Sequence, residues 1–115
     1  MKLVNLTPHG VTLRNSAGVD TIVPPSGTIA RVSSTPGLPE QVEGVPVPVF
    51  GRETFGEVTG LPAPEDGAVF IVSLLVAQAT RGTRLDVVRP GTGLNDGAIR
   101  DEAGQIQAVT RLVRA

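Results

Sequence analysis

The sequence predicts one mainly β (α+β) domain, a small barrel or sandwich of short antiparallel strands with one short helix near residues 73–80. The chain has 115 residues, which suffices for a single domain, residues 1–115, with a modest core. Its 14 Gly and 10 Pro indicate frequent turns and short strands. Because three Phe are the only aromatic residues, the core is expected to be aliphatic.

The N-terminal part predicts three strands, at residues 2–6, 10–14 and 21–23. A proline and a glycine break the chain between the first two strands. The turn NSAGVD, residues 15–20, joins the second strand to the third. Its asparagine opens the turn, and its glycine takes the left-handed conformation that closes a hairpin with a bulge.

The middle of the chain is rich in turn residues. A PPSG turn at 24–27 leads into TIARVS, residues 28–33, whose alternation predicts a strand. Residues 34–44 are predicted to form a surface loop. The prolines of VPVPVF, residues 45–50, donate no ladder hydrogen bonds, so this stretch is expected to be an edge strand or an extended segment. Residues 55–67 continue as an extended, turn-rich segment.

The pattern then changes to buried strands and one helix. GAVFIVS, residues 67–73, has the pattern of a buried strand. A short helix follows over 73–79, with Ser73 as its N-cap and Gly82 beyond its end. LDVVRP, residues 85–90, predicts another strand.

The chain ends in a predicted hairpin formed by residues 99–100 and 105–113. Its turn DEAG, residues 101–104, repeats the chemistry of NSAG near the start. Two hairpins with the same turn chemistry support a fold built from sheets.

Composition excludes several classes of protein. The absence of cysteine excludes disulfides, thiolate chemistry and cysteine metal sites. A net charge of −1 gives no electrostatic footprint for DNA or RNA. No apolar run approaches the ~20 residues of a membrane span, and the N-terminus lacks a signal-peptide pattern, so a cytoplasmic protein without membrane contact is expected.

Metal and nucleotide motifs are weak in this sequence. One histidine and scattered carboxylates form no recognisable metal site, and no cofactor is expected, although a Mg²⁺ held jointly by a substrate phosphate stays open. The loop RPGTGLNDG, residues 89–97, is neither a P-loop nor a dinucleotide fingerprint, and a plain mobile loop is the simpler interpretation.

Arginine dominates the cations, with nine Arg against one Lys. Arg84 and Asp86 lie two residues apart, so they share a face if the segment is extended. One interpretation is a structural ion pair. The other is an arginine fork that Asp86 holds in position for an anion.

His9, the sole histidine, stands in LTPHG behind Thr7 and Pro8. It is a turn or interface residue, or a ligand contact, or a general acid or base, since its ordinary pKa is near 6.5. Thr7 lies on the same side of an extended strand as His9. Ser73 lacks the surroundings of a nucleophile elbow, so helix capping is its first interpretation.

Six segments together resemble a family of small proteins found largely in tailed phages and prophages. They are NLTPHGVTL, PPSGTIARVS, FGEVTGLPAPEDG, FIVSLLVAQA, RLDVVRPGT and RDEAGQIQAVTRL. The resemblance implies a phage origin and suggests a role against nucleotide-signalled bacterial immunity in the infected host. The site residues that it suggests are His9, Arg31, Ser73, Arg84 and Asp86.

Three functions follow as hypotheses, and whether the protein is an enzyme stays open. In the first, a homo-oligomer sequesters a cyclic dinucleotide or a cyclic ADP-ribose type signal, with Arg31 and Arg84 on phosphates and His9 on a base or phosphate. In the second, a metal-independent phosphodiesterase cleaves that signal with His9 as general acid or base, aided weakly by Thr7. In the third, the chain is a phage structural or assembly protein, and its proline-rich segment is an interaction surface.

Overall fold

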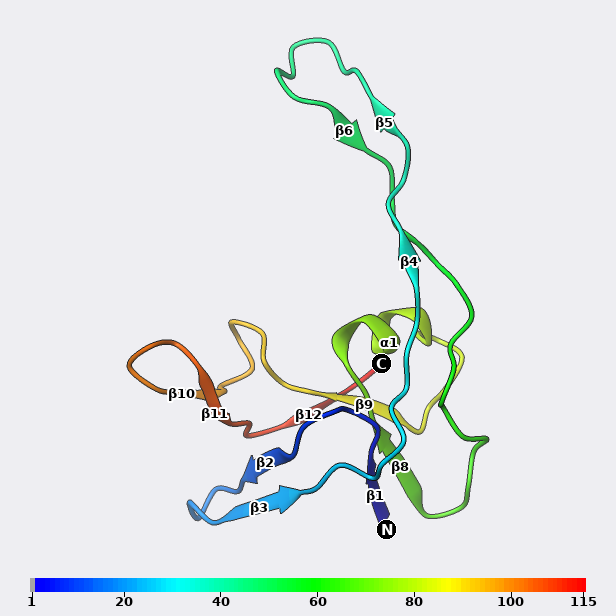
Figure 1. Ribbon diagram of the computed structural model, residues 1–115. Coiled ribbons are helices and arrows are strands. Elements are labelled where there is room, and N and C mark those ends of the chain that lie inside the picture. Colours follow the sequence, from blue (N-terminus) through cyan, green and yellow to red (C-terminus); the bar gives the residue numbers. More distant parts are fainter. Residues whose placement is uncertain (1) are drawn as a thin grey trace.

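The computed structural model describes residues 2–115, which form a small body and a long arm (Figure 1). The strands of the body are β1 (Lys2–Asn5), β2 (Val11–Arg14), β3 (Asp20–Val23), β8 (Ala68–Ile71), β9 (Val87–Pro90), β10 (Ile99–Arg100), β11 (Ile106–Ala108) and β12 (Leu112–Arg114). The strands of the arm are β4 (Ser34–Thr35), β5 (Pro39–Glu40), β6 (Val49–Phe50) and β7 (Thr54–Phe55). The helix α1 spans Leu74–Ala79. The prediction of a mainly β fold with one short helix is confirmed.

A four-stranded sheet of order β1-β8-β9-β12 forms the centre of the body. β1, β8 and β9 run parallel to one another, and β12 runs antiparallel to β9. The chain passes from β8 through α1 to β9, so these elements form a short βαβ unit. The sheets do not close into a barrel, and the parallel pairs depart from the all-antiparallel arrangement that the sequence predicted.

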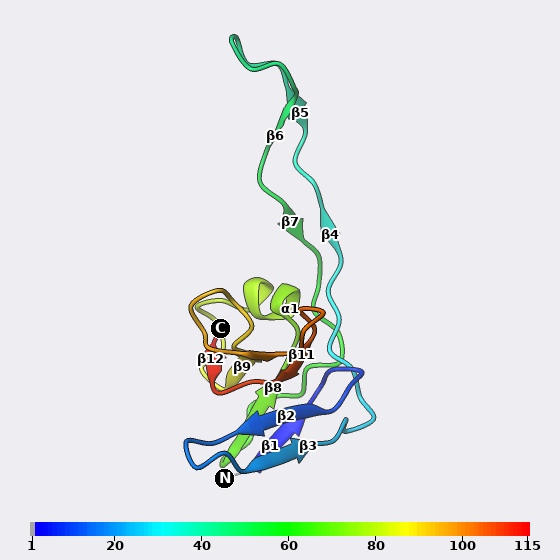
Figure 2. The same cartoon turned by 90° about the vertical axis from the view of Figure 1, so that its left-hand side faces the viewer.

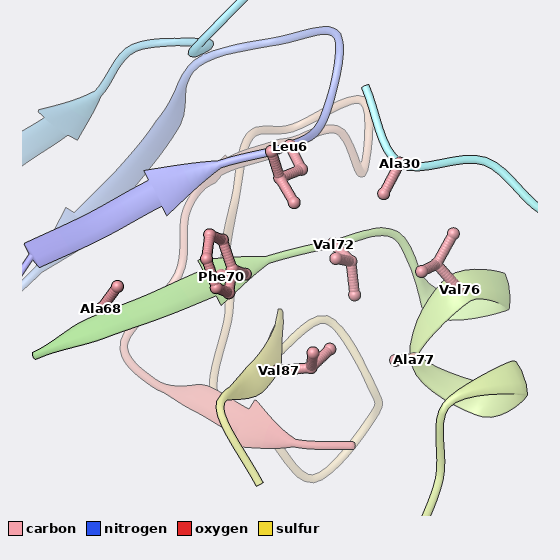
Figure 3. Close-up of a cluster of buried hydrophobic side chains, with 8 residues drawn as sticks. All are labelled: Leu6, Ala30, Ala68, Phe70, Val72, Val76, Ala77 and Val87. Carbon is pink, nitrogen blue, oxygen red and sulfur yellow. The ribbon is translucent and has the colours of Figure 1, made fainter. Parts of the chain in front are cut away.

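Two small cores cover the two faces of this sheet. On one face, Phe70 and Val87 pack with Leu6, Ala30 and the inner side of α1 (Figure 3). On the other face, Ile71 packs against the β2–β3 hairpin. Successive residues of β8 and β9 thus point into different cores, which explains the continuous apolar pattern of both strands.

Both predicted turns have the same geometry. The side-chain oxygen of Asn15 accepts hydrogen bonds from the amides of Ala17 and Val19, and Gly18 has φ +79°. Asp101 does the same for the amides two and four residues further on, and Gly104 has φ +81°. The predicted β2–β3 hairpin is therefore confirmed. The C-terminal hairpin is confirmed only for β10 and β11, because the predicted strand 105–113 ends at Ala108 and β12 pairs with β9 instead.

Residues 28–33 do not form the predicted strand. Successive amides of this segment bond to different parts of the chain: Ala30 donates to the carbonyl of Leu6, and Arg31 donates to that of Thr59. Only Arg31 forms a β-bridge, with Thr59. The alternating sequence therefore reflects contacts to two neighbours rather than one continuous ladder.

The segment predicted as a surface loop, residues 34–44, instead enters the arm through β4 and β5. VPVPVF forms part of its return path, but only Val49 and Phe50 pair, with β5. Pro46 and Pro48 lie outside the ladder, as expected from their missing amide protons. In both views the arm extends away from the body (Figures 1 and 2).

Candidate ligand pocket

A buried amide organises the LTPHG segment. Asn5 donates through Nδ2 to the carbonyls of His9, at 2.8 Å, and Val23, at 3.0 Å. Its Oδ1 accepts from the amide of Thr7 at 2.9 Å and lies 2.6 Å from the Thr7 hydroxyl. The Thr7 hydroxyl also lies 2.9 Å from the His9 carbonyl. This hydroxyl is therefore used within the loop rather than offered to a ligand.

Three segments distant in sequence meet beside this loop and enclose a pocket of about 240 Å³, here called the Arg31 pocket. It is lined by Leu6, Thr7, Pro8, Ile29, Ala30, Arg31, Val32, Ser73, Leu75 and Val76. The lining joins the LTP segment, the IARV segment and the start of α1. Arg31 is the charged residue among them.

The backbone of Arg31 is held on both sides. Its amide donates to the Thr59 carbonyl, and its carbonyl accepts from the Thr59 amide, each at 2.8 Å. Gly60 makes this approach possible: its φ is +78°, and a Cβ there would lie 2.3 Å from the carbonyl oxygen of Ile29. The guanidinium of Arg31 forms no ion pair within residues 2–115. A fixed backbone thus carries an available cation.

Ser73 is the N-cap of α1, which confirms that part of its predicted role. Its Oγ accepts from the amide of Val76 at 3.4 Å, and the residue is exposed. An accepting hydroxyl keeps its own proton, so Ser73 can also donate a hydrogen bond into the pocket.

His9 lies at a different site from Arg31. It is exposed and lines a second pocket of about 370 Å³, together with residues of β2, β9 and β11. This second lining contains no carboxylate and no arginine. The structure therefore does not bring His9 together with any of the predicted phosphate contacts.

Arg84 and Asp86 also lie outside the Arg31 pocket. They form a bidentate ion pair, with Nε–Oδ1 and Nη2–Oδ2 both at 2.8 Å. Nη2 of Arg84 also donates to the Pro62 carbonyl at 2.8 Å, and the guanidinium lies 6.0 Å from the centre of the Phe70 ring. This geometry matches the structural interpretation of the pair, because it ties the Pro62 loop to the core.

Sequence reasoning missed Asn5 and Gly60. An asparagine two residues before a threonine is a signal of a local side-chain turn, and it could have marked Asn5. No local signal marks Gly60, since its role depends on a contact with Ile29. Within residues 2–115, no group of three or more His, Cys, Asp or Glu could hold a metal ion, and no helix is long and apolar enough to cross a bilayer.

Comparison with models of protein families, with curated proteins and with solved structures finds no match to this chain. The resemblance to small phage proteins therefore stays a hypothesis. It rests on the six quoted segments, three of which supply residues to the Arg31 pocket.

Replacing Asn5 by Ala is expected to lower the free energy of unfolding by about 1–3 kcal/mol, because two carbonyls and one amide lose their partner. Urea unfolding measures this change. Asn95→Ala is the control, since Asn95 is exposed, and its effect is expected to stay within about 0.5 kcal/mol. Equal effects of the two variants would contradict the structural role of Asn5.

The pKa of Asp86 lies below its usual value, chiefly because Arg84 donates hydrogen bonds to the carboxylate. A carboxyl group with a lowered folded-state pKa stabilises the fold above its unfolded pKa, near 4, and loses this contribution as the pH falls through the folded value. Asp86→Asn should therefore cost roughly 1–3 kcal/mol at pH 7. We expect this difference from the unmodified chain to shrink steadily below about pH 4.

Denaturant unfolding at several pH values tests this expectation. The control Asp66→Asn removes an exposed carboxylate that forms no ion pair within the described chain. A cost of Asp86→Asn that stays constant as the pH falls from 7 until the fold unfolds in acid would show that the ion pair is not its source.

Proposed function

We propose that this chain binds a small phosphate-bearing ligand of the nucleotide type in the Arg31 pocket and holds it without cleaving it. The observation that carries the proposal is the position of Arg31, a cation with a fixed backbone and no carboxylate partner within residues 2–115, in a concave site. A guanidinium fork matches the oxygens of a phosphate and remains charged at any physiological pH.

The remainder of the lining suits the other parts of a nucleotide. Ser73 offers a hydroxyl proton to a phosphate or a ribose oxygen. Pro8, Ile29 and Leu75 supply an apolar wall on which the face of a base or sugar can rest. Ligand sites commonly combine such an apolar lining with a few placed polar groups.

The same lining favours binding over cleavage. It contains no His, Asp, Glu, Lys or Cys, and so offers no side chain suited to general acid–base catalysis near neutral pH. Sequestration needs only affinity and enough copies of the protein. The alternative, a phosphodiesterase that uses His9, would need that residue to act from the second pocket.

The volume of the Arg31 pocket limits how much of a ligand it can hold. Pockets for drug-sized ligands commonly measure about 300–1,000 Å³, and the Arg31 pocket measures about 240 Å³. One phosphate with its sugar or base fits such a space, and the remainder of a cyclic dinucleotide or cyclic ADP-ribose would lie outside it. The resemblance to phage proteins suggests a host immune signal as the ligand of this class.

The direct experiment incubates the purified chain with cyclic dinucleotides and cyclic ADP-ribose isomers in excess chelator. Chromatography then measures free ligand before and after heat denaturation of the protein. Depletion followed by return of the intact ligand supports sequestration. Linear products would establish cleavage and contradict the proposal, and the absence of depletion with every probe would overturn it.

Two substitutions locate the site. Arg31→Ala is expected to weaken binding roughly 10–100-fold, because it removes a charged hydrogen-bond donor. Ser73→Asp keeps a good N-cap but places a carboxylate in the lining, so we expect at least about tenfold weaker binding with an unchanged melting temperature. Calorimetry and thermal unfolding measure the two properties.

Matched controls separate the site from net charge. Arg111→Ala removes a cation that does not line this pocket, and Ser16→Asp adds a carboxylate on the β2–β3 turn. Both are expected to bind as the unmodified chain does. If the control variants lose as much affinity for the ligand as the Arg31 and Ser73 variants do, the ligand binds at another site.

A second candidate function, a structural or assembly role in a phage particle, is favoured by the exposed arm. The proline-rich segment 45–50 lies on it, where it is free to contact another protein. Mass spectrometry of purified particles of a phage that encodes the chain tests this role. Stoichiometric presence is the expected result, and absence would contradict it.

A further inference from the structure

Residues 33–56, here called the arm, form a long ribbon outside the body (Figures 1 and 2). Each of its two ladders, β4 with β7 and β5 with β6, pairs only two residues per strand. Every residue of the arm except Gly37 is exposed. The arm therefore contributes nothing to either core of the body and has no core of its own.

Large apolar side chains are concentrated on the arm. Seven of the fifteen exposed large hydrophobic residues are found there: Leu38, Val42, Val45, Val47, Val49, Phe50 and Phe55. Leu38 is 87% exposed and Phe50 is 57% exposed. An isolated two-stranded hairpin is marginally stable in water, and a large apolar patch marks an interaction surface. These side chains need a partner to bury them.

The path of the arm is nonetheless specified. Gly37 and Gly51 face each other between the two ladders, and a Cβ at Gly37 would lie 2.3 Å from the carbonyl carbon of Gly51. The amide of Gly51 donates to the Leu38 carbonyl at 3.1 Å. Because only glycine permits this close approach, the sequence favours this particular backbone conformation of the arm.

The exposed side of α1 complements the arm. Leu74 is 53% exposed, and Arg81 stands beyond the end of the helix. A groove of about 270 Å³ runs along this side, lined by Leu74, Ala77, Gln78, Arg81, Arg89 and Ala115. It contains two arginines, of which Arg89 forms an ion pair with Asp96 at 3.7 Å. We call this surface the α1 face.

The charges of the two surfaces are opposite. The arm carries Glu40, Glu43 and Glu53 against the single cation Arg52. None of the three carboxylates forms an ion pair within residues 2–115, and Arg81 forms none either. An apolar, acidic ribbon and an apolar, basic groove are complementary in both respects.

The contact requires a second molecule. In both views the far end of the arm points away from α1 of its own chain (Figures 1 and 2). Pro46 and Pro48 lack amide protons, which disfavours addition of another strand to this edge. Side-chain packing uses the exposed apolar residues of the arm without a new strand pairing, and reciprocal exchange between two copies satisfies both surfaces of each.

We propose that the arm of one copy packs on the α1 face of a second copy, and that the second copy returns the same contact. The valines and Phe50 of the arm then cover Leu74, and the arm carboxylates face Arg81. This inference does not rest on the proposed ligand binding.

Sedimentation velocity over a range of concentrations tests the proposal with the full chain. We expect a monomer–dimer equilibrium that weakens as the salt concentration rises, since opposite charges meet. Val47→Ser with Phe50→Ser should raise the dissociation constant at least about tenfold, and Leu74→Gln should act in the same direction. Circular dichroism checks that each variant keeps its fold.

The control is Val19→Ser with Ile22→Ser, which removes two similarly exposed apolar side chains from the β2–β3 hairpin. It should leave the dissociation constant unchanged. A chain that stays monomeric at every concentration, or a dimer that the arm variant does not weaken, would overturn the proposal.

A mixing experiment distinguishes this pairing from contact between two arms. A mixture of the arm variant and the Leu74 variant forms a heterodimer with one intact arm seated on one intact α1 face. We expect this heterodimer to be tighter than either mutant homodimer. If mixing gives no such gain, the arms do not dock on α1, and the proposal is wrong.

Discussion

The fold depends on the junction at Asn5 and Leu6, where the first strand ends. The buried Asn5 amide joins the LTPHG loop to β3 through the carbonyls of His9 and Val23. The amide of Leu6 donates to the carbonyl of Ile71 in β8, and its carbonyl accepts from Ala30. A single dipeptide thus connects the central sheet, the β2–β3 hairpin and the segment that carries Arg31. Because a buried amide without partners is costly, breaking these hydrogen bonds is expected to destabilise all three connected parts.

The arginines differ in whether their side chains are used by the fold. Arg84 is held by Asp86 and the Pro62 carbonyl, and Arg14 is held by Asp20 across the β2–β3 hairpin. Their hydrogen-bonding capacity supports the fold. Arg31 differs because its neighbours on the Leu6 side are apolar and its backbone, rather than its side chain, makes the structural contacts. The candidate site is therefore the place where the fold positions a charge and leaves it without a carboxylate partner in the described chain.

The parts of the fold that the sequence predicted are those with local causes. The turns at Asn15 and Asp101 and the N-cap at Ser73 each depend on a side chain that bonds to backbone within four residues. The parallel pairing of β1 with β8 joins residues more than sixty positions apart, and no pattern in either sequence indicates which strand it pairs with. The Arg31 pocket is non-local in the same way, which is why its arginine and serine were named but their separation from His9 was not. Residues 28–33 show the converse error, since alternation is also produced by two different neighbours.

The arm and the Arg31 pocket depend on the same backbone hydrogen bonds. Arg31 and Thr59 form the last backbone bridge of the body before the chain enters the arm, and the Gly56 amide donates to the Ser33 carbonyl at the next step outward. The bonds that fix the backbone of Arg31 therefore also fix the direction in which the arm leaves. Gly60 is required here, because a side chain there would displace Ile29 and with it the segment that carries Arg31. A chain with two small cores can carry so long an exposed segment because its base is anchored by backbone hydrogen bonds rather than by packing along its length.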